Sequence, residues 1–201
     1  MAPDFEKQSY WHERFASETS FEWLVPSAAF MPHITPYLSA SVSQRILNLG
    51  SGTSDLHTHF RARGYHDVTN VDYEPRALDR GREIEERAFG NTQMHYAVAD
   101  VTRLCADLYG ARAFDLVVDK STSDAVSCGG DAAVRNMAQG VRECLVADGA
   151  WISLSYSATR FEIEDLPFDV RVIAKILTPK ARPSEPDVFY WCYLLRPRSD
   201  I

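Results

Sequence analysis

Two glycines and an acid twenty-two residues after the first of them are the residues of this sequence best suited to hold a ligand. Residues 46–55 read Ile-Leu-Asn-Leu-Gly-Ser-Gly-Thr-Ser-Asp, an apolar run that breaks into a turn containing Gly50, Ser51 and Gly52. Asp72 ends a second run, residues 67–72. Glycines allow the backbone to approach a ligand closely, and an acid at the end of the next strand accepts hydrogen bonds from ribose hydroxyls. The spacing therefore predicts a nucleoside site between two neighbouring strands.

The same turn discriminates between classes of nucleotide. A phosphate-binding P-loop needs Gly-Lys at its end, and the sequence contains no Gly-Lys pair. The dinucleotide motif needs a third glycine where Asp55 stands, and a carboxylate there would repel a pyrophosphate. A nucleoside without phosphates tolerates this acid, and a cationic one would be attracted to it. S-adenosylmethionine meets both conditions and is the expected cofactor.

Further candidate residues lie where two later apolar runs end. Asp100 can accept a hydrogen bond from the adenine amine, while the backbone N–H of Val101 bonds a ring nitrogen. The alternative is that Asp100 caps a helix beginning at residue 102. Asp119 and Lys120 end the run 114–120 and should border the ligand crevice, which lies at the carboxyl ends of the strands. The alternative there is a local ion pair, with Asp124 capping the next helix.

Aromatic residues are concentrated ahead of the first strand. Trp11 and Phe15 are four residues apart, so a single helix places them on one face. Trp23 follows in Phe-Glu-Trp, and a proline-marked helical stretch covers residues 26–38. We expect residues 1–40 to form a helical lid or brace over the ligand edge of the sheet.

Apolar periodicity predicts the elements that position these residues. Short runs of strand character alternate with longer amphipathic segments, as in a doubly wound α/β sheet. The last two runs are joined by a proline-rich loop without helical period, which predicts an antiparallel pair at the sheet edge. We expect one domain over residues 1–201, with a Rossmann-like core over 41–201: a seven-stranded, mostly parallel sheet with an antiparallel C-terminal edge strand, in three αβα layers. Strands are expected at 45–49, 68–72, 94–99, 114–119, 150–156, 170–177 and 189–196, and helices at 54–63, 75–89, 102–109 and 131–145.

Bulk composition argues against several classes of function. A net charge of −7 is opposite to the basic surface of most nucleic-acid-binding domains. No apolar stretch approaches the roughly 20 residues that span a bilayer, and the N-terminus has no signal-peptide core. The four cysteines contain no Cys-x-x-Cys pair, and no histidine pair has the spacing of a zinc site. We therefore expect reduced thiols, no bound metal, no nucleic-acid or membrane partner, and a cytoplasmic location.

Five short motifs occur along the chain: Tyr-Trp-x-x-Arg-Phe (residues 10–15), Phe-Glu-Trp (21–23), Leu-Gly-Ser-Gly-Thr-Ser (49–54), Val-Thr-Asn-Val-Asp (68–72) and Asp-Lys-Ser-Thr-x-Asp-Ala (119–125). Together they resemble the class I S-adenosylmethionine-dependent methyltransferases in their seven-stranded form. Within that class the chain looks like the elongation-factor lysine methyltransferase-like group, and the resemblance covers nearly the whole chain. The first and last motifs point to the group, and the others to the class.

The resemblance implies where the cofactor would lie. The glycine turn, Gly50 with Ser51 and Gly52, would pass under the methionine part. Asp72 would hold the ribose and Tyr73 would pack on the adenine. Two further residues, Asp100 and Val101, would bind the edge of the adenine.

The resemblance also implies a wall around the cofactor. Three aromatic residues would form it: Trp11, Phe15 and Trp23. Arg14 would be available to the cofactor carboxylate, and Lys120 would border the cofactor.

The resemblance further implies methyl transfer to a protein lysine by in-line displacement, and we expect Asp119 to contact the acceptor. The acceptor side departs from the family: Ser121 stands where glycine is common, and residues 72–75 replace the usual Asp-x-Ser. Two alternatives therefore stay open: a small-molecule O-, N- or S-methyltransferase of a biosynthetic pathway, and a non-catalytic cofactor-binding scaffold. The expected partner is a protein with an accessible lysine, or a small-molecule acceptor.

Overall fold

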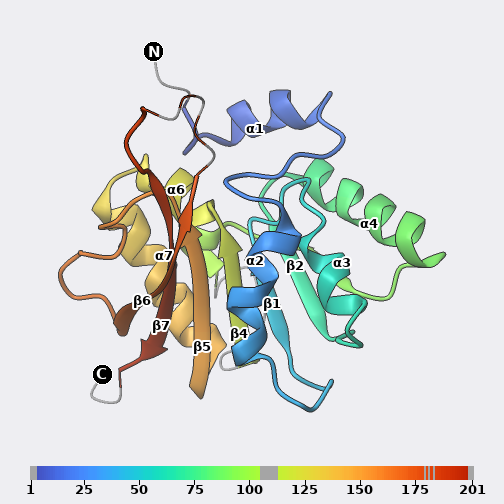
Figure 1. Ribbon diagram of the computed structural model, residues 1–201. Coiled ribbons are helices and arrows are strands. Elements are labelled where there is room, and N and C mark those ends of the chain that lie inside the picture. Colours follow the sequence, from blue (N-terminus) through green and yellow to red (C-terminus); the bar gives the residue numbers. More distant parts are fainter. Residues whose placement is uncertain (1–3, 105–112, 179, 181, 183, 199–201) are drawn as a thin grey trace.

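A computed structural model describes residues 4–104, 113–178, 180, 182 and 184–198 of the chain. Its seven strands form one sheet with helices on both faces (Figure 1). The strands are β1 (Ile46–Leu49), β2 (Val68–Asp72), β3 (His95–Val98), β4 (Phe114–Lys120), β5 (Leu145–Ser155), β6 (Phe168–Leu177) and β7 (Phe189–Pro197).

The strand order is β3-β2-β1-β4-β5-β7-β6. Strands β1 to β5 pair in parallel, whereas β7 pairs antiparallel with both β5 and β6. The expected Rossmann-like, mostly parallel sheet with antiparallel C-terminal pairing is confirmed. One detail differs, because the antiparallel strand β7 lies between β5 and β6 and leaves β6 as the edge strand.

The helices and strands follow the expected pattern with two main differences. The short helix α6 was not predicted, because six residues are too few to establish a helical period. Strand β5 begins directly after α7 instead of at residue 150, with a register shift against β4 between Phe114 and Leu116. Of the helix expected over 102–109, the described residues show a 3-10 turn over Val101–Arg103 and α-helix at residue 104, and residues 105–109 lie outside the described ones. The helices are α1 (Gln8–Phe15), α2 (Ser27–Ile34), η1 (Thr35–Tyr37), α3 (Leu56–Arg61), α4 (Pro75–Phe89), η2 (Val101–Arg103), α6 (Thr122–Ser127) and α7 (Asp131–Cys144).

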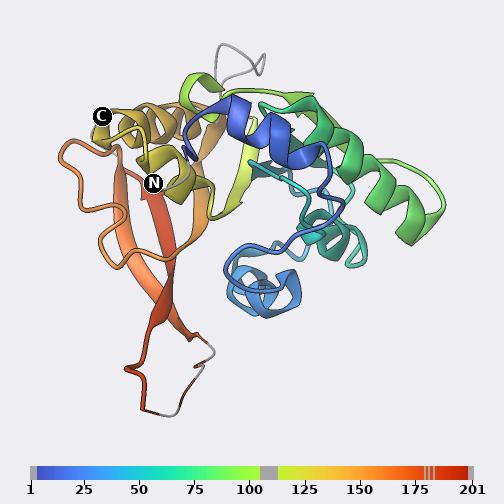
Figure 2. The same cartoon turned by 90° about the horizontal axis from the view of Figure 1, so that it is seen from above.

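Alternate residues of the strands build two separate cores. Seen from above, α6 and α7 lie on one side of the sheet and α2 lies on the other (Figure 2). On β4, Val117 belongs to the core under α7, whereas Leu116 and Val118 belong to the core under α2 and α3. This alternation is the period-two pattern of strands that are covered on both faces. Among the described residues, no helix has the length and apolar content needed to cross a bilayer.

A buried carboxylate links the end of β4 to its neighbours. Asp119 is fully buried, its Oδ2 accepts from Nε1 of Trp151 on β5 (2.8 Å), and its Oδ1 accepts from the backbone N–H of Ser123 in α6 (3.0 Å). Burial raises the pKa of Asp119 to about 6. These bonds fix the start of α6 relative to the central strands, and α6 flanks the ligand edge.

Replacing Trp151 by Phe keeps an aromatic ring in the core and removes the donor to Asp119. Because a buried acceptor then loses its partner, we expect the free energy of unfolding to fall by about 2 kcal/mol. Urea denaturation followed by circular dichroism measures this change. Trp191→Phe is the matched control, since Trp191 is only partly buried. An equal loss in both variants would contradict the assigned role of the Trp151–Asp119 bond.

Candidate functional site

The turn after β1 needs glycine at two positions. Gly50 and Gly52 have φ of 57° and 52°, in the left-handed region that disfavours side chains. A Cβ on Gly50 would also collide with the side chain of Thr122. Thr122 Oγ1 instead donates to the carbonyl of Leu49 (2.8 Å). The missing side chain therefore lets the first turn of α6 contact the end of β1, at the point where the strand order reverses.

Asp72 ends β2 beside this turn. It is 5% exposed; its Oδ2 accepts from the N–H of Gly52 and its Oδ1 from the N–H of Glu74, both at 3.0 Å. Burial raises the pKa of Asp72 to about 6. A carboxylate has about four acceptor positions, so both oxygens can also accept from ligand hydroxyls.

Asp100 follows β3 and begins η2. Its Oδ1 accepts from the backbone N–H of Thr102 (2.9 Å) and from the Thr102 hydroxyl (2.7 Å). The capping role that we considered as an alternative is therefore confirmed. Asp100 and Val101 also line the cavity described below, so capping and ligand contact do not exclude each other.

Residues 4–27, which we call the N-terminal segment, lie across the carboxyl ends of the strands. Its helix α1 is held against the start of α4. Gln8 Nε2 donates to the Tyr73 carbonyl (2.6 Å), Arg76 Nη1 donates to the His12 carbonyl (2.7 Å), and His12 Nδ1 lies 3.2 Å from the Glu74 carboxylate. The segment is thus anchored on the β2 side of the crevice.

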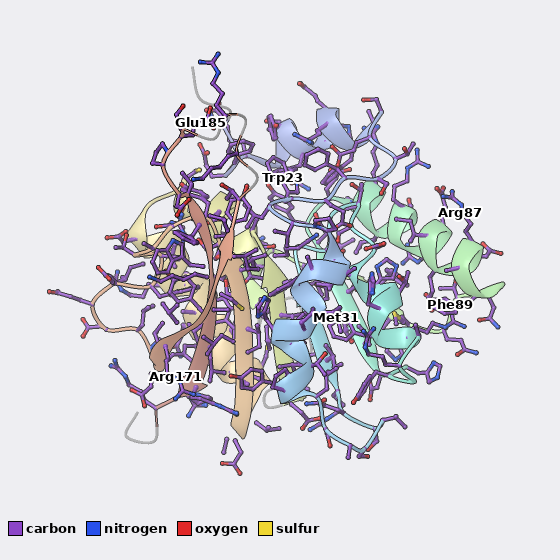
Figure 3. The ribbon with its side chains drawn as sticks, in the orientation of Figure 1. Trp23, Met31, Arg87, Phe89, Arg171 and Glu185 are labelled. Carbon is purple, nitrogen blue, oxygen red and sulfur yellow. The ribbon has the colours of Figure 1, made fainter. Side chains whose placement is uncertain are left out.

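The later part of the segment is anchored on the β1 and β4 side. Glu18 accepts from the Thr53 hydroxyl (2.7 Å), and Glu22 accepts from the N–H of Asp55 (2.9 Å). Figure 3 shows Trp23 beneath α1, at the upper end of the sheet. Ring centroids 5.1–5.9 Å apart join six aromatic residues of the segment into one cluster: Phe5, Tyr10, Trp11, Phe15, Phe21 and Trp23.

The segment and the strand ends enclose a cavity of about 630 Å³. Its size is typical of sites for small molecules and cofactors. Most of the residues selected from the sequence line it: Trp11, Phe15, Trp23, Gly50, Ser51, Gly52, Asp72, Tyr73, Asp100, Val101 and Lys120.

Two selected residues do not line the cavity. Arg14 Nε donates to Glu18 (2.6 Å), and its guanidinium lies 4.8 Å and 4.7 Å from the ring centroids of Phe21 and Trp23. Arg14 thus stabilises the aromatic cluster by stacking on two of its rings, without lining the cavity. Asp119 faces the core under α7, so the expected contact with an acceptor has no support in this geometry; its position fits a bond acceptor that supports α6.

Lys120 lines the cavity, but its ammonium is directed at the N-terminal segment. Nζ pairs with the Glu22 carboxylate and donates to the Val25 carbonyl (3.2 Å). Its side chain is 4% exposed. Burial lowers the pKa of Lys120 to about 7. The Glu22 carboxylate that pairs with Nζ is a neighbour that favours the charged form.

The sequence departure at Ser121 has a structural explanation. Ser121 has φ of 70°, the conformation for which glycine is suited, and its hydroxyl donates to Asp124 Oδ2 (3.1 Å). Asp124 also accepts from the N–H of Tyr156 (3.1 Å) and from Arg160 Nε (2.9 Å). Ser121, Asp124 and Tyr156 line the cavity and were not selected from the sequence. The Asp-Lys-Ser-Thr-x-Asp-Ala motif contains Ser121 and Asp124, whereas no sequence motif indicated Tyr156.

The lining suits a nucleoside cofactor. Two left-handed glycines allow close backbone approach, and Asp72 offers acceptors for ribose hydroxyls. Ser51 Oγ is buried at this turn and has no hydrogen-bond partner among the described residues. A ligand in the cavity would satisfy it.

Comparisons with known proteins agree with this geometry. No protein-family model matches the chain. The chain is 54% identical to the methyltransferase srdJ of Neurospora crassa, over 99% of its own length and 87% of that protein. It is 27% identical to mouse EEF1A lysine methyltransferase 4, over 79% of its own length and 64% of that protein.

Among solved structures, one concerning the conversion of a disulfide bond into a thioacetal group during echinomycin biosynthesis superimposes with a TM-score of 0.70. The match covers 94% of this chain and 89% of the other, at 19% identity, and it supports the fold. The identity to srdJ over nearly the whole chain, with the glycine turn and Asp72 at the switch point of the sheet, shows that the chain belongs to the class I S-adenosylmethionine-dependent methyltransferases.

Proposed function

We propose that the protein transfers the methyl group of S-adenosylmethionine to a small molecule that enters the cavity beneath the N-terminal segment. The observation that carries this proposal is the anchoring of that segment on both sides of the crevice, through Gln8 on one side and Glu22 on the other. Anchored in this way, residues 4–27 act as a lid that turns an open edge into a partly enclosed cavity. A cavity of about 630 Å³ suits a cofactor and a compact acceptor.

The residues that would hold the cofactor stand at the carboxyl ends of β1, β2 and β3. The turn at Gly50 and Ser51 would support its methionine part, and the Asp72 carboxylate would accept from the ribose hydroxyls. Tyr73 would pack on the adenine, and Asp100 and Val101 would bind its edge. When bound, the cofactor supplies an electrophilic methyl group on a sulfonium.

The residues around the methyl end contribute alignment. In-line displacement requires the acceptor atom, the methyl carbon and the sulfur to be collinear, and holding them so can supply several kcal/mol of the barrier. Trp23 and Tyr156 offer apolar surface for the acceptor, and the Ser121 hydroxyl oxygen offers a polar contact. Asp119 accepts from the N–H of Ser123 and so fixes the start of α6, which directly follows Ser121.

A protein lysine is the second candidate acceptor. The 27% identity to mouse EEF1A lysine methyltransferase 4 and the net charge of −7, which suits a lysine-rich partner, favour it. The identity to srdJ is higher and extends over nearly the whole chain, and srdJ is not named as a lysine methyltransferase. We therefore rank the small-molecule acceptor first.

The two candidates differ in where the methyl group goes. S-adenosylmethionine with a radiolabelled methyl group is incubated with the protein and a lysate of the source organism, and the mixture is divided into a protein gel and an organic extract. We expect label in the extract and none in a protein band above the level of Asp72→Ala, the matched control. A labelled protein band that requires Asp72 would contradict the small-molecule assignment and support a protein acceptor.

Cofactor affinity should depend on the ionisation of Asp72. The pKa of Asp72 is raised to about 6, so protonation below that pH removes the ionised acceptor for the ribose. We expect the Kd for S-adenosylhomocysteine, measured by calorimetry, to rise about tenfold from about pH 7.5 to about pH 5. Stability of the free protein changes in the other direction: a raised folded pKa favours the folded state below about pH 4, and that contribution is lost as the pH rises through about 6.

Asp72→Asn is the matched variant for this measurement, because it keeps the shape of the side chain and cannot ionise. Its affinity should be lower than that of the native protein at neutral pH and nearly independent of pH over the same range. If the native protein also shows a flat profile, Asp72 does not hold the ribose through its charge.

A further inference from the structure

Lys120 directs all of its described polar contacts at one short stretch of the N-terminal segment. Its Nζ pairs with the Glu22 carboxylate, donates to the Val25 carbonyl (3.2 Å), and lies 3.5 Å from the Ser27 hydroxyl. The Lys120 side chain is 4% exposed and that of Glu22 is 24% exposed, so the pair is shielded from solvent mainly on the side of the lysine. Removing one partner of a buried charge pair is strongly destabilising, since the other charge is left without compensation.

The stretch that Lys120 contacts contains a strained turn. Leu24 has φ of 63°, a left-handed conformation that is uncommon for a side chain of this size. The N–H of Val25 donates to the carbonyl of Trp23 (2.7 Å), two residues earlier, as in a γ-turn. A strained conformation persists only where surrounding contacts hold it. Trp23 and Leu24, the residues of this turn, both line the cavity.

Glu22 connects the same turn to the cofactor side of the crevice. Its Oε1 accepts from the N–H of Asp55 (2.9 Å), after the glycine turn, and its Oε2 accepts from the Ser27 hydroxyl (2.9 Å). The Ser27 hydroxyl also lies 3.1 Å from that of Ser54, which lines the cavity. The end of β4, the turn after β1 and the strained turn are therefore joined through one carboxylate.

We propose that Lys120 is a positioning residue that acts through Glu22 and the Val25 carbonyl, holding the strained turn so that Trp23 and Leu24 form a wall of the cavity. This role differs from a direct contact with the cofactor. Because the turn borders both cofactor and acceptor space, the Lys120–Glu22 pair makes the shape of the cavity depend on the N-terminal segment.

Amide hydrogen exchange on the full-length protein without ligand tests this role. Lys120→Met removes the charge and keeps most of the stem, and Glu22→Gln keeps the shape of its partner. We expect each to speed exchange in residues 22–27 by about tenfold or more, with residues 131–144 unchanged. The double variant should exchange no faster than the single variants, because the two residues act as a pair. Glu13→Gln, on the exposed face of α1, is the control and should match the native protein.

The Kd for S-adenosylhomocysteine, measured by calorimetry, separates positioning from direct contact. Positioning predicts that Lys120→Met and Glu22→Gln weaken binding by similar factors, together with the faster exchange. Weaker binding by Lys120→Met with native exchange at residues 22–27 would overturn the proposal, as would native exchange in Glu22→Gln. If Lys120→Met does not fold, Glu22→Gln carries the test, since it leaves the buried cation in place. The exchange measurement uses no acceptor, so its outcome is independent of whether the acceptor is a small molecule.

Discussion

The close approach of the turn after β1 to the end of β4 is the constraint on which the rest of the site depends. The strand order reverses at this point, so the chain leaves β1 towards β2 and leaves β4 towards β5. Such a reversal opens a crevice at the carboxyl ends of the strands. At the bottom of the crevice, between β1 and β4, the missing Cβ of Gly50 lets Thr122 pack closely. The opposite side of the crevice is covered by the N-terminal segment.

Buried charges concentrate around this crevice, and each is stabilised in a different way. Asp72 accepts from backbone N–H groups, Asp119 from an indole and an amide, and Asp124 from a guanidinium. Burial alone would favour neutral side chains, since desolvation disfavours the charged form. The hydrogen-bond donors around these carboxylates act against that tendency and at the same time fix the loops that carry them.

The sequence was sufficient to predict the sheet, the glycine turn and a set of residues most of which line the cavity, because those features are local. Gly50, Asp72 and Asp100 each follow or end a strand. The carboxyl ends of parallel strands all lie at the ligand edge of the sheet, so a residue at such an end is expected there. The expected contact of Asp119 with an acceptor gains no support from the geometry, and the sequence already held a reason for this. Asp119 shares strand parity with Val117, which faces α7, so alternation alone directs its side chain into the core. The partners of Lys120 could not have been predicted, since Glu22, Val25 and Ser27 precede it in the chain by 93 to 98 positions.

The pairing of Lys120 with Glu22 also has an evolutionary consequence. A lineage that loses the acid keeps a cation that is 4% exposed and has lost its counter-charge, and a lineage that loses the cation leaves a carboxylate without it. Neither change is neutral by itself, so substitutions at positions 22 and 120 are expected to occur together among descendants of this protein. Substitutions between residues 22 and 27 are expected to be those that keep the contacts of Lys120 with this stretch. The N-terminus is therefore inherited as part of the methyltransferase core.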